Sequence, residues 1–422
     1  MRYTAAFCSL AFAAASFLPV PAPAEVFKAR RAEDLRTSIG VVTHFNYTDG
    51  AYARSDEAVR ALAYLGISHL RDQSPTPWIR GSAPLQTYTD LMKHGYRFNF
   101  LALGGKFDPS ATTVQLTKLE EACPGMIDAI EGFNEVDHAP VSYQGKTGPD
   151  AAIKAQAALY AAIRADPVFG HLPVYDLTGA DWPKPGEKRA DFVNAHLYPQ
   201  NGSPPADWFN DAADRALKQE SPLVVSEFGY ASLPESGWLV IGVDQRSQAK
   251  GLLLGLFQGF SRNIERTYIY ELFDEKPDPA LKEREFHFGL FDANYRQKAA
   301  AKAIHNLTTI LGDPSATNRT FQPGSIDVNV DAFPQGIRGL VIAKADGTLF
   351  LAMWNNTAFW NRPTGTPMES APVSVTLALP DGLKARALFD PLESAEAVRA
   401  FTGESSLTLD VPDHPVLLQV RR

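Results

Sequence analysis

The sequence predicts an α/β protein in which a (β/α)8 barrel is followed by a small antiparallel β-sandwich. Two observations support this fold class. Between about residues 38 and 311, short β-branched runs alternate with longer helical patterns, and after residue 312 the pattern changes to a period of two with frequent turns. The chain has 422 residues, which is longer than one average domain. We therefore expect a barrel over residues 25–312 and a sandwich over residues 313–422.

The first 24 residues have the composition of a secretory leader. Arg2 is their only charge, residues 5–18 are apolar, and Ala22-Pro23-Ala24 fits the small-residue rule for cleavage. The apolar run is shorter than the roughly 20 residues that a membrane span needs. We therefore expect a signal peptide over residues 1–24, no membrane anchor after its removal, and a secreted or periplasmic protein.

Eight short runs in the first region have the character of buried strands, and helical patterns lie between them. The strands are expected at residues 39–42, 68–71, 98–102, 130–133, 174–177, 192–195, 223–226 and 268–270, and helices at 56–65, 149–164, 208–219 and 244–260. Eight strands, each followed by a helix, match the size of a barrel. A doubly wound sheet is the alternative, but it usually carries a glycine-rich phosphate turn after its first strand, and residues 41–45 offer none.

The last part of the chain alternates in the manner of half-buried strands. These strands are expected at residues 339–343, 348–354, 373–377, 406–409 and 416–420. Ala345-Asp346-Gly347 lies between the first two, and glycine there tolerates the positive φ of a hairpin turn. The pattern predicts a sandwich of antiparallel strands.

Charge and cysteine content exclude several classes of function. The formal net charge is −8 and there is no cluster of Lys and Arg, so we expect no nucleic-acid partner. The sequence has only two cysteines, which excludes a cysteine-rich metal site or a disulfide scaffold. Removal of the leader takes Cys8 away and leaves Cys123 alone, so the mature chain is expected to lack an internal disulfide. We also expect a monomer.

Two glutamates stand where catalytic residues of a barrel are expected, at the carboxyl ends of strands. Glu135 follows the fourth strand and Glu227 the seventh. An ionisable group that closes an apolar strand is costly unless it has partners or a role. Each glutamate alone could be a solvated strand-end residue, but two carboxylates facing one cavity are what glycoside hydrolysis requires.

The residues around these glutamates resemble the retaining glycoside hydrolases of clan A, including families 39 and 5. The four matching segments are Glu131-Gly132-Phe133-Asn134-Glu135, His196-Leu197-Tyr198-Pro199, Ser226-Glu227-Phe228-Gly229-Tyr230, and Phe288-Gly289-Leu290-Phe291-Asp292 with Lys298-Ala299-Ala300. They come in the order of the clan's motifs at successive strand ends. The resemblance implies hydrolysis of a β-linked oligo- or polysaccharide, with Glu135 as acid/base and Glu227 as nucleophile, and it implies no cofactor.

The same resemblance gives expected roles to the neighbours of the two glutamates. Asn134 would donate to the sugar 2-hydroxyl or, alternatively, serve as a turn residue, and Tyr198 would orient Glu227 or be a core aromatic. A buried Arg71 needs a carboxylate, which could be Glu227 or, in a purely structural pair, Asp72 or another acid. His196 is expected either to be a hydrogen-bonded residue at a strand end or to contact the substrate, and His44 is a further candidate for substrate contact.

Loop aromatics and one further acid complete the predicted binding site. Trp78, Trp182 and Trp238 each follow a strand end, and one or two of them are expected to stack on sugar rings; Trp182 and Trp238 are our candidates. Glu271 is expected to contact a polar group of the substrate or, alternatively, to bind neighbouring groups of the protein. Thr43-His44-Phe45 lacks the His-x-His of metal-dependent barrel hydrolases, so no metal is expected.

Two other functions are compatible with the same sequence. One is a glycan-binding protein on a barrel that no longer turns over substrate, although both glutamates are present. The other is an accessory that trims or releases an exopolysaccharide during export, with the same chemistry and a different substrate.

Overall fold

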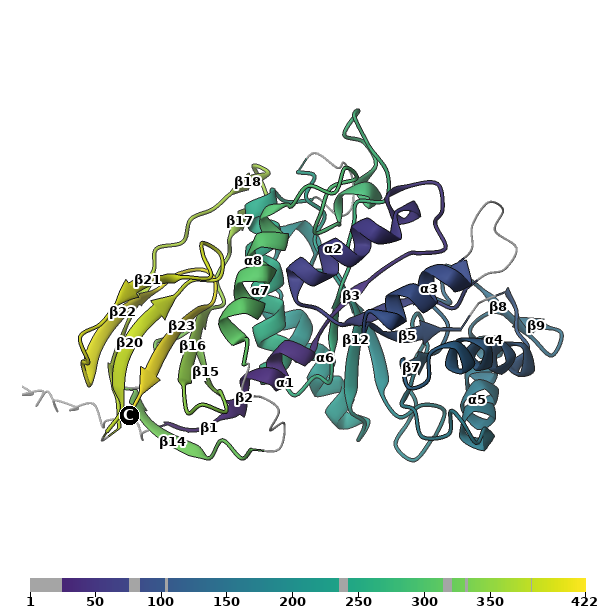
Figure 1. Cartoon of the computed structure of the whole chain (residues 1–422), viewed down its shortest axis with the longest axis horizontal. Helices are drawn as coiled ribbons and strands as arrows, with labels where there is room; N and C mark the ends of the chain where they lie inside the picture. Colours follow the sequence, from purple (N-terminus) through teal and green to yellow (C-terminus); the bar gives the residue numbers. More distant parts are fainter. Residues whose placement is uncertain are drawn as a thin grey trace, which may run out of the picture.

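The computed structural model describes residues 25–75, 84–102, 105–234, 242–313, 321–330, 333–380 and 382–422 (Figure 1). The predicted leader and the candidate platforms Trp78 and Trp238 lie outside these ranges. None of the helices in the described ranges combines the length and apolar character that a membrane crossing requires.

An eight-stranded parallel sheet forms the barrel, which confirms the predicted fold class. Its order is β10-β7-β5-β4-β3-β13-β12-β11, and a bridge between Tyr175 and Phe192 brings the first and last strands together. The strands are β3 (Ile39–Val42), β4 (His69–Gln73), β5 (Arg97–Leu101), β7 (Ile127–Glu131), β10 (Val174–Tyr175), β11 (Val193–Leu197), β12 (Leu223–Phe228) and β13 (Thr267–Ile269). The parallel arrangement places all their carboxyl ends, and the side chains that follow them, around one mouth.

Helices surround the barrel and follow seven of its eight strands. They are α2 (Ser55–Leu65), α3 (Pro84–Lys93), α4 (Pro109–Ala122), α5 (Pro149–Ala165), α6 (Ala206–Lys218), α7 (Gln245–Ser261) and α8 (Ala299–Leu311), with a short α1 (Ala32–Thr37) before β3. Three 3-10 turns lie in the connections, at η1 (Ala51–Ala53), η2 (Gln200–Gly202) and η3 (Arg284–His287). A small sheet beside the mouth contains β6 (Gly105–Lys106), β8 (Val141–Tyr143) and β9 (Lys146–Thr147).

The expectation that every strand is followed by a helix is wrong at the fifth strand, β10. Residues 176–192 contain no helix. Pro183 and Pro185 lack the backbone N–H that a helix needs, and Gly186 adopts a φ of 84°. A buried bidentate ion pair holds the segment instead, with Arg189 Nε and Nη2 each 2.9 Å from the carboxylate of Asp176. The absence of this helix leaves a space between α5 and α6 open, and this space is a cavity that extends to Glu135.

Two sheets form the C-terminal sandwich, and their strands are antiparallel except that β2 runs parallel to β15. One has the order β1-β14-β19-β22 and the other β2-β15-β16-β23-β20-β21. The strands are β1 (Glu25–Lys28), β2 (Arg30–Arg31), β14 (Ser325–Val330), β15 (Ile337–Ala343), β16 (Leu349–Asn355), β19 (Val373–Ala378), β20 (Lys384–Phe389), β21 (Ala397–Ala400), β22 (Ser406–Val411) and β23 (Val416–Arg421), and a separate ribbon pairs β17 (Trp360–Asn361) with β18 (Thr366–Pro367). The predicted barrel range began at residue 25, whereas β1 and β2 are hydrogen-bonded to β14 and β15 of the sandwich.

The six-stranded sheet lies between two apolar surfaces. Met353 on β16 packs in the core of the sandwich, while Trp354 beside it packs toward the barrel, with its ring centroid 5.7 Å from that of Phe257 on α7. Figure 1 shows α7 and α8 between this sheet and the barrel strands. Helix α7 is buried on all sides from Ser247 to Phe260, as expected for a helix enclosed by two domains. The sandwich is therefore joined to the barrel by a continuous apolar core.

Candidate active site

A cavity of about 330 Å³ opens at the carboxyl ends of the barrel strands, and we call it the nucleophile pocket because Glu227 lines it. Glu227 lies on β12, its side chain is 8% exposed, and Arg71 Nη1 on β4 donates to its Oε1 at 2.6 Å. The pocket is lined by Val42, Thr43, His44, Tyr47, Arg71, Asp72, Gln73, Leu101, Asn134, Glu135, Tyr198, Glu227, Tyr270, Arg284, Glu285 and Phe288.

Arg71 is held beneath this pocket by a second carboxylate that the sequence analysis did not assign a role. Its Nε and Nη2 donate to Glu131 on β7 at 2.8–3.1 Å, and both side chains are nearly inaccessible. Glu131 in turn accepts hydrogen bonds from three buried side chains, those of Asn99, Asn194 and Ser226. The alternative partner Asp72 instead accepts bonds from Thr43, Phe45, Gln73 and Tyr88, and burial raises its pKa to about 7. Arg71 is therefore fixed in place by Glu131 and presents one nitrogen to Glu227.

Glu135 and Glu227 approach each other across the pocket. One oxygen of each carboxylate and one nitrogen of His196 all lie within 4.8 Å of one another. His196 Nδ1 is 2.8 Å from Glu135 Oε1 and 3.4 Å from Glu227 Oε2, and its other nitrogen lies 3.1 Å from Ser226 Oγ. Tyr198 donates from its hydroxyl to Glu227 Oε2. The structure thus brings Glu135, Glu227, His196 and Tyr198 together, which are four of the side chains to which the clan A resemblance gave expected roles.

The two carboxylates differ in their surroundings. The Glu227 side chain is 8% exposed and that of Glu135 is 38% exposed. Burial pushes the pKa of Glu227 upward, but the nearby His196 and Arg71 outweigh it and hold this pKa below its usual value. The hydrogen bond from His196 also lowers the pKa of Glu135. A general acid would require the opposite shift of this pKa.

The backbone around Glu135 is fixed by the neighbouring strand end. Glu135 has a φ of 41°, which a non-glycine residue seldom adopts, and its N–H donates to Thr178 Oγ1 at 2.9 Å. The next residue, Val136, donates its N–H to the carbonyl of Thr178 at 2.9 Å. These bonds set the direction in which the Glu135 side chain leaves the strand end.

The side-chain amide of Asn134 is oriented so that its nitrogen can donate a hydrogen bond to a bound hydroxyl group. Its Oδ1 accepts from Arg71 Nη2 at 2.8 Å, which directs the amide nitrogen away from Arg71. That nitrogen has two N–H donors, and Asn134 lines the nucleophile pocket. The side chain can therefore donate to a group bound beside Glu227.

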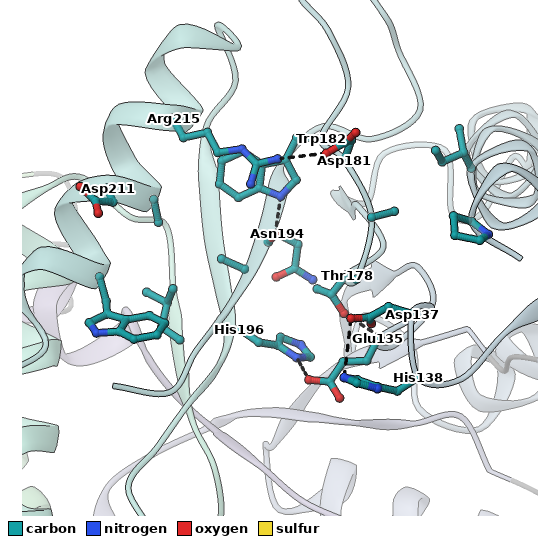
Figure 2. Close-up of a pocket in the computed structure, with 18 of the residues that line it drawn as sticks. Glu135, Asp137, His138, Thr178, Asp181, Trp182, Asn194, His196, Asp211 and Arg215 are labelled. Atoms are coloured by element: carbon teal, nitrogen blue, oxygen red, sulfur yellow. Dashed lines mark hydrogen bonds and ion pairs between the residues drawn. The ribbon is translucent and has the colours of Figure 1, made fainter. Parts of the chain in front are cut away.

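A second and larger cavity, of about 980 Å³, adjoins the first at Glu135, and we call it the α5–α6 groove. It is lined by Glu135, Asp137, His138, Pro149, Asp150, Ile153, Thr178, Gly179, Ala180, Asp181, Trp182, Asn194, Ala195, His196, Leu197, Asp207, Trp208, Asp211, Ala212 and Arg215. Figure 2 shows Glu135, His196 and His138 at one end of the groove and Trp182 with Arg215 at the other. The predicted platform Trp182 donates its indole N–H to the carbonyl of Asn194 at 2.8 Å, and Arg215 covers its ring at 4.2 Å.

His44 lines the nucleophile pocket, whereas Glu271 lies behind it in the protein interior. His44 stacks on Tyr47 at 4.7 Å, and burial lowers its pKa to about 4. Glu271, which was expected to contact substrate, lines neither cavity: it is fully buried, 3.4 Å from His44 Nε2, and it accepts from the hydroxyl of Tyr52 at 2.9 Å. Burial raises the pKa of Glu271 well above its usual value.

Two groups of side chains have the composition of a metal site. One consists of Glu135, His196 and Glu227, and the other of His44, Glu271 and Glu275; in each group one candidate ligand atom per residue lies within 4.8 Å of the others. The first group already has an arrangement suited to acid/base and nucleophilic chemistry.

Sequence reasoning missed Glu131, Asn99 and Asn194, although each lies on a predicted or observed barrel strand. Asn99 and Asn194 interrupt otherwise apolar strands, and a buried polar residue in such a position requires a partner. That requirement was the available signal. Residues Arg284 and Glu285 of η3, which also line the nucleophile pocket, had no such signal because they lie in a long connection between β13 and α8.

The barrel and the paired carboxylates define a protein with the fold of the clan A glycoside hydrolases. Among solved structures, a family 39 glycoside hydrolase from Bacteroides cellulosilyticus WH2 is similar with a TM-score of 0.60 and 13% identity, over 92% of this chain and 82% of that one. A monomeric β-xylosidase from Caulobacter crescentus CB15 has a TM-score of 0.57 at 11% identity, over 93% and 98% of the two chains. A family 39 enzyme from Xanthomonas axonopodis pv. citri has a TM-score of 0.55 at 13% identity, over 93% and 96%.

These similarities extend over both domains and confirm the predicted resemblance at the level of the fold. No protein-family profile matches the sequence, and no curated protein matches it either. At such low identity the likeness describes the fold, so the activity has to be argued from the side chains of this chain.

Proposed function

We propose that the protein is a glycoside hydrolase that cleaves β-glycosidic bonds by a retaining double displacement. The observation that supports this best is that one oxygen of Glu135 lies within 4.8 Å of one oxygen of Glu227, with the first carboxylate partly exposed and the second buried against Arg71. Retaining enzymes hold their carboxyl groups about 5–5.5 Å apart, whereas inverting enzymes leave about 6.5–9.5 Å for a water molecule. The short separation favours direct attack on the sugar.

In the first step Glu227 attacks the anomeric carbon of a sugar in the nucleophile pocket. The bond from that carbon to the glycosidic oxygen breaks, and the oxygen takes the proton from Glu135 as the leaving group departs. Arg71 and Tyr198 hold the two oxygens of Glu227, which fixes the carboxylate and keeps it ionised. Asn134 donates to the hydroxyl beside the anomeric carbon.

In the second step Glu135, now ionised, accepts a proton from water. The hydroxide attacks the anomeric carbon, the ester bond to Glu227 breaks, and Glu227 leaves as a carboxylate while the sugar retains its configuration. His196 is placed to stabilise Glu135 in this ionised state, since its Nδ1 lies 2.8 Å from Glu135 Oε1. Its contact therefore supports the second step and has to loosen for the first.

The test is hydrolysis of a panel of aryl β-glycosides and β-glycans by the wild type and by Glu227→Ala and Glu135→Ala. We expect both variants to lose on the order of 10³-fold or more in kcat, because each removes a group that bonds only at the reacting centre. Azide should restore activity to Glu227→Ala with inversion of the product, since it enters from the face that the nucleophile has vacated. Activity that survives in Glu227→Ala would contradict the assignment of the nucleophile, and tight glycan binding without turnover by the wild type would indicate a binding protein.

We also propose that the protein acts outside the cytoplasm on an oligo- or polysaccharide. The basis is the composition of residues 1–24, which fits a leader, and the lone mature Cys123, which is buried and free. N-terminal sequencing of protein from the extracellular and periplasmic fractions tests this proposal. A chain that retains residues 1–24 in a cytoplasmic fraction would contradict it.

A further inference from the structure

The α5–α6 groove meets the nucleophile pocket at a single catalytic side chain. Glu135 lines both cavities, whereas Glu227 lines only the nucleophile pocket. If Glu227 attacks the sugar in that pocket, the glycosidic oxygen lies at Glu135, and the group beyond this oxygen extends away from Glu227. The α5–α6 groove begins at Glu135, which Figure 2 shows at one end of it, and Glu227 is not among the residues that line this groove.

The groove has a defined origin in the fold. It lies where a helix would otherwise follow β10, and its walls are α5, α6 and the segment 178–182. Trp182 in that segment donates its indole N–H to the carbonyl of Asn194. The connection that contains the segment is held further by the pair of Arg189 with Asp176 and by Gln156 Nε2, which donates to the carbonyl of Arg189 at 3.1 Å. The groove is therefore part of the rigid barrel surface.

The size and lining of the groove suit a chain of sugars. Its volume of about 980 Å³ is close to the upper end of the range for ligand sites and three times that of the nucleophile pocket, at about 330 Å³. Two half-buried indoles line it, and sugar C–H faces pack on such rings. Arg215 occupies a face of Trp182, so Trp208 on α6 is the ring we expect to carry a sugar.

The charges along the groove are almost all negative. Among the residues that line it in the described part of the chain, Arg215 supplies a positive charge and five aspartates supply negative ones: Asp137, Asp150, Asp181, Asp207 and Asp211. Arg215 approaches only Asp181, at 4.0 Å. A groove of one sign repels ligands of the same sign and concentrates neutral or cationic ones.

We infer that the α5–α6 groove binds the leaving-group side of the glycan and selects sugar units that carry no negative charge. This inference rests on the proposed function, since it takes Glu135 to be the proton donor. The substrate is then a chain that continues for several units beyond the cleaved bond with neutral or amino-bearing sugars, while chains with uronic acids on that side are rejected.

The test compares three substrates that share the sugar bound in the nucleophile pocket and differ in their leaving group. The leaving groups are a nitrophenol, a neutral oligosaccharide, and the same oligosaccharide with a uronic acid as the unit attached to the cleaved bond. Trp208→Ala should lower kcat/KM about tenfold for the neutral oligosaccharide and less than about twofold for the nitrophenyl glycoside. Asp211→Lys should raise kcat/KM for the uronic-acid substrate about fivefold at low salt, and the gain should shrink at high salt.

Asp214→Lys is the matched control for the charge. Asp214 is exposed on the same helix, where it pairs with Arg262, and does not line the groove, so its replacement gives the same change in net charge elsewhere. Equal effects of Asp211→Lys and Asp214→Lys would overturn the inference about charge, and equal losses in Trp208→Ala on oligosaccharide and nitrophenyl glycoside would overturn the assignment of the groove. In either case cleavage of the nitrophenyl glycoside, and its loss in Glu227→Ala, would leave the proposed hydrolysis intact.

Discussion

Two buried ionic networks in this protein are built from similar side chains and differ in what surrounds them. The mouth network consists of Arg71, Glu131 and Glu227 and borders the nucleophile pocket. The interface network consists of Lys250 on α7 with Asp413, His414 and Asp390, and it lies between the barrel and the sandwich. None of its four residues lines either catalytic cavity.

The charges are balanced differently in the two networks. At the interface, Lys250 pairs with Asp413 at 2.7 Å, and the two nitrogens of His414 each lie 3.0 Å from an aspartate. At the mouth, one guanidinium faces two carboxylates, and the bidentate position belongs to Glu131. Glu227 therefore keeps an ionised carboxylate beside a cavity. A buried ion pair alone therefore does not mark a functional site, whereas an excess carboxylate with access to a ligand does.

The largest effect on stability should come from replacing Glu131, which holds Arg71 in the mouth network. Glu131→Gln removes the bidentate partner of the buried Arg71, and we expect the free energy of unfolding to fall by about 3–5 kcal/mol. Glu227→Gln should cost much less, because Arg71 keeps Glu131. Urea denaturation of the two variants measures the difference. Equal losses would mean that the two carboxylates share the structural role.

A smaller loss of stability, with no loss of activity, should follow from breaking the interface network. Lys250→Met leaves Asp413 buried without its ammonium partner, and we expect a loss of about 3 kcal/mol. The kcat on an aryl glycoside should stay within about twofold of the wild type, since the change is remote from both cavities. Lys250→Met combined with Asp413→Leu should recover part of the stability. If the single variant instead abolished activity in a folded protein, the separation of the two networks would be wrong.

The smallest effect we predict is a shift of the pH profile. His196→Ala removes the hydrogen bond that holds the pKa of Glu135 down, so that pKa rises. The charge of His196 also lowers the pKa of Glu227, so this pKa rises as well. Because kcat/KM requires protonated Glu135 and ionised Glu227, both limbs of the bell-shaped profile should move to higher pH. His138→Ala is the control, as His138 is 79% exposed and should shift the profile far less. A shift to lower pH would contradict the assignment of the two carboxylates.

Much of the fold could be predicted because its signals are local. The change from helical to period-two patterning near residue 312 separates the alternating barrel region from the sandwich strands, and the strand-end glutamates follow from the strands. The absence of a helix after β10 also has a local signal in the sequence, Pro183 and Pro185. The groove has no such signal, because it exists only where α5 and α6 flank the gap.

The rest depends on contacts between residues that are far apart in the chain. Strand β1 pairs with β14, and Arg71 meets Glu227 across 156 positions. Glu271 and Glu227 both follow apolar strands, yet one is sealed behind His44 and the other lines a cavity. The sequence by itself determined the period of each segment, its breaks and the order of its acidic strand ends, because these are properties of neighbouring residues. Only the tertiary structure decided which carboxylate is paired, which is buried and which faces a ligand, because burial and charge pairing are set by side chains that the closed barrel brings together.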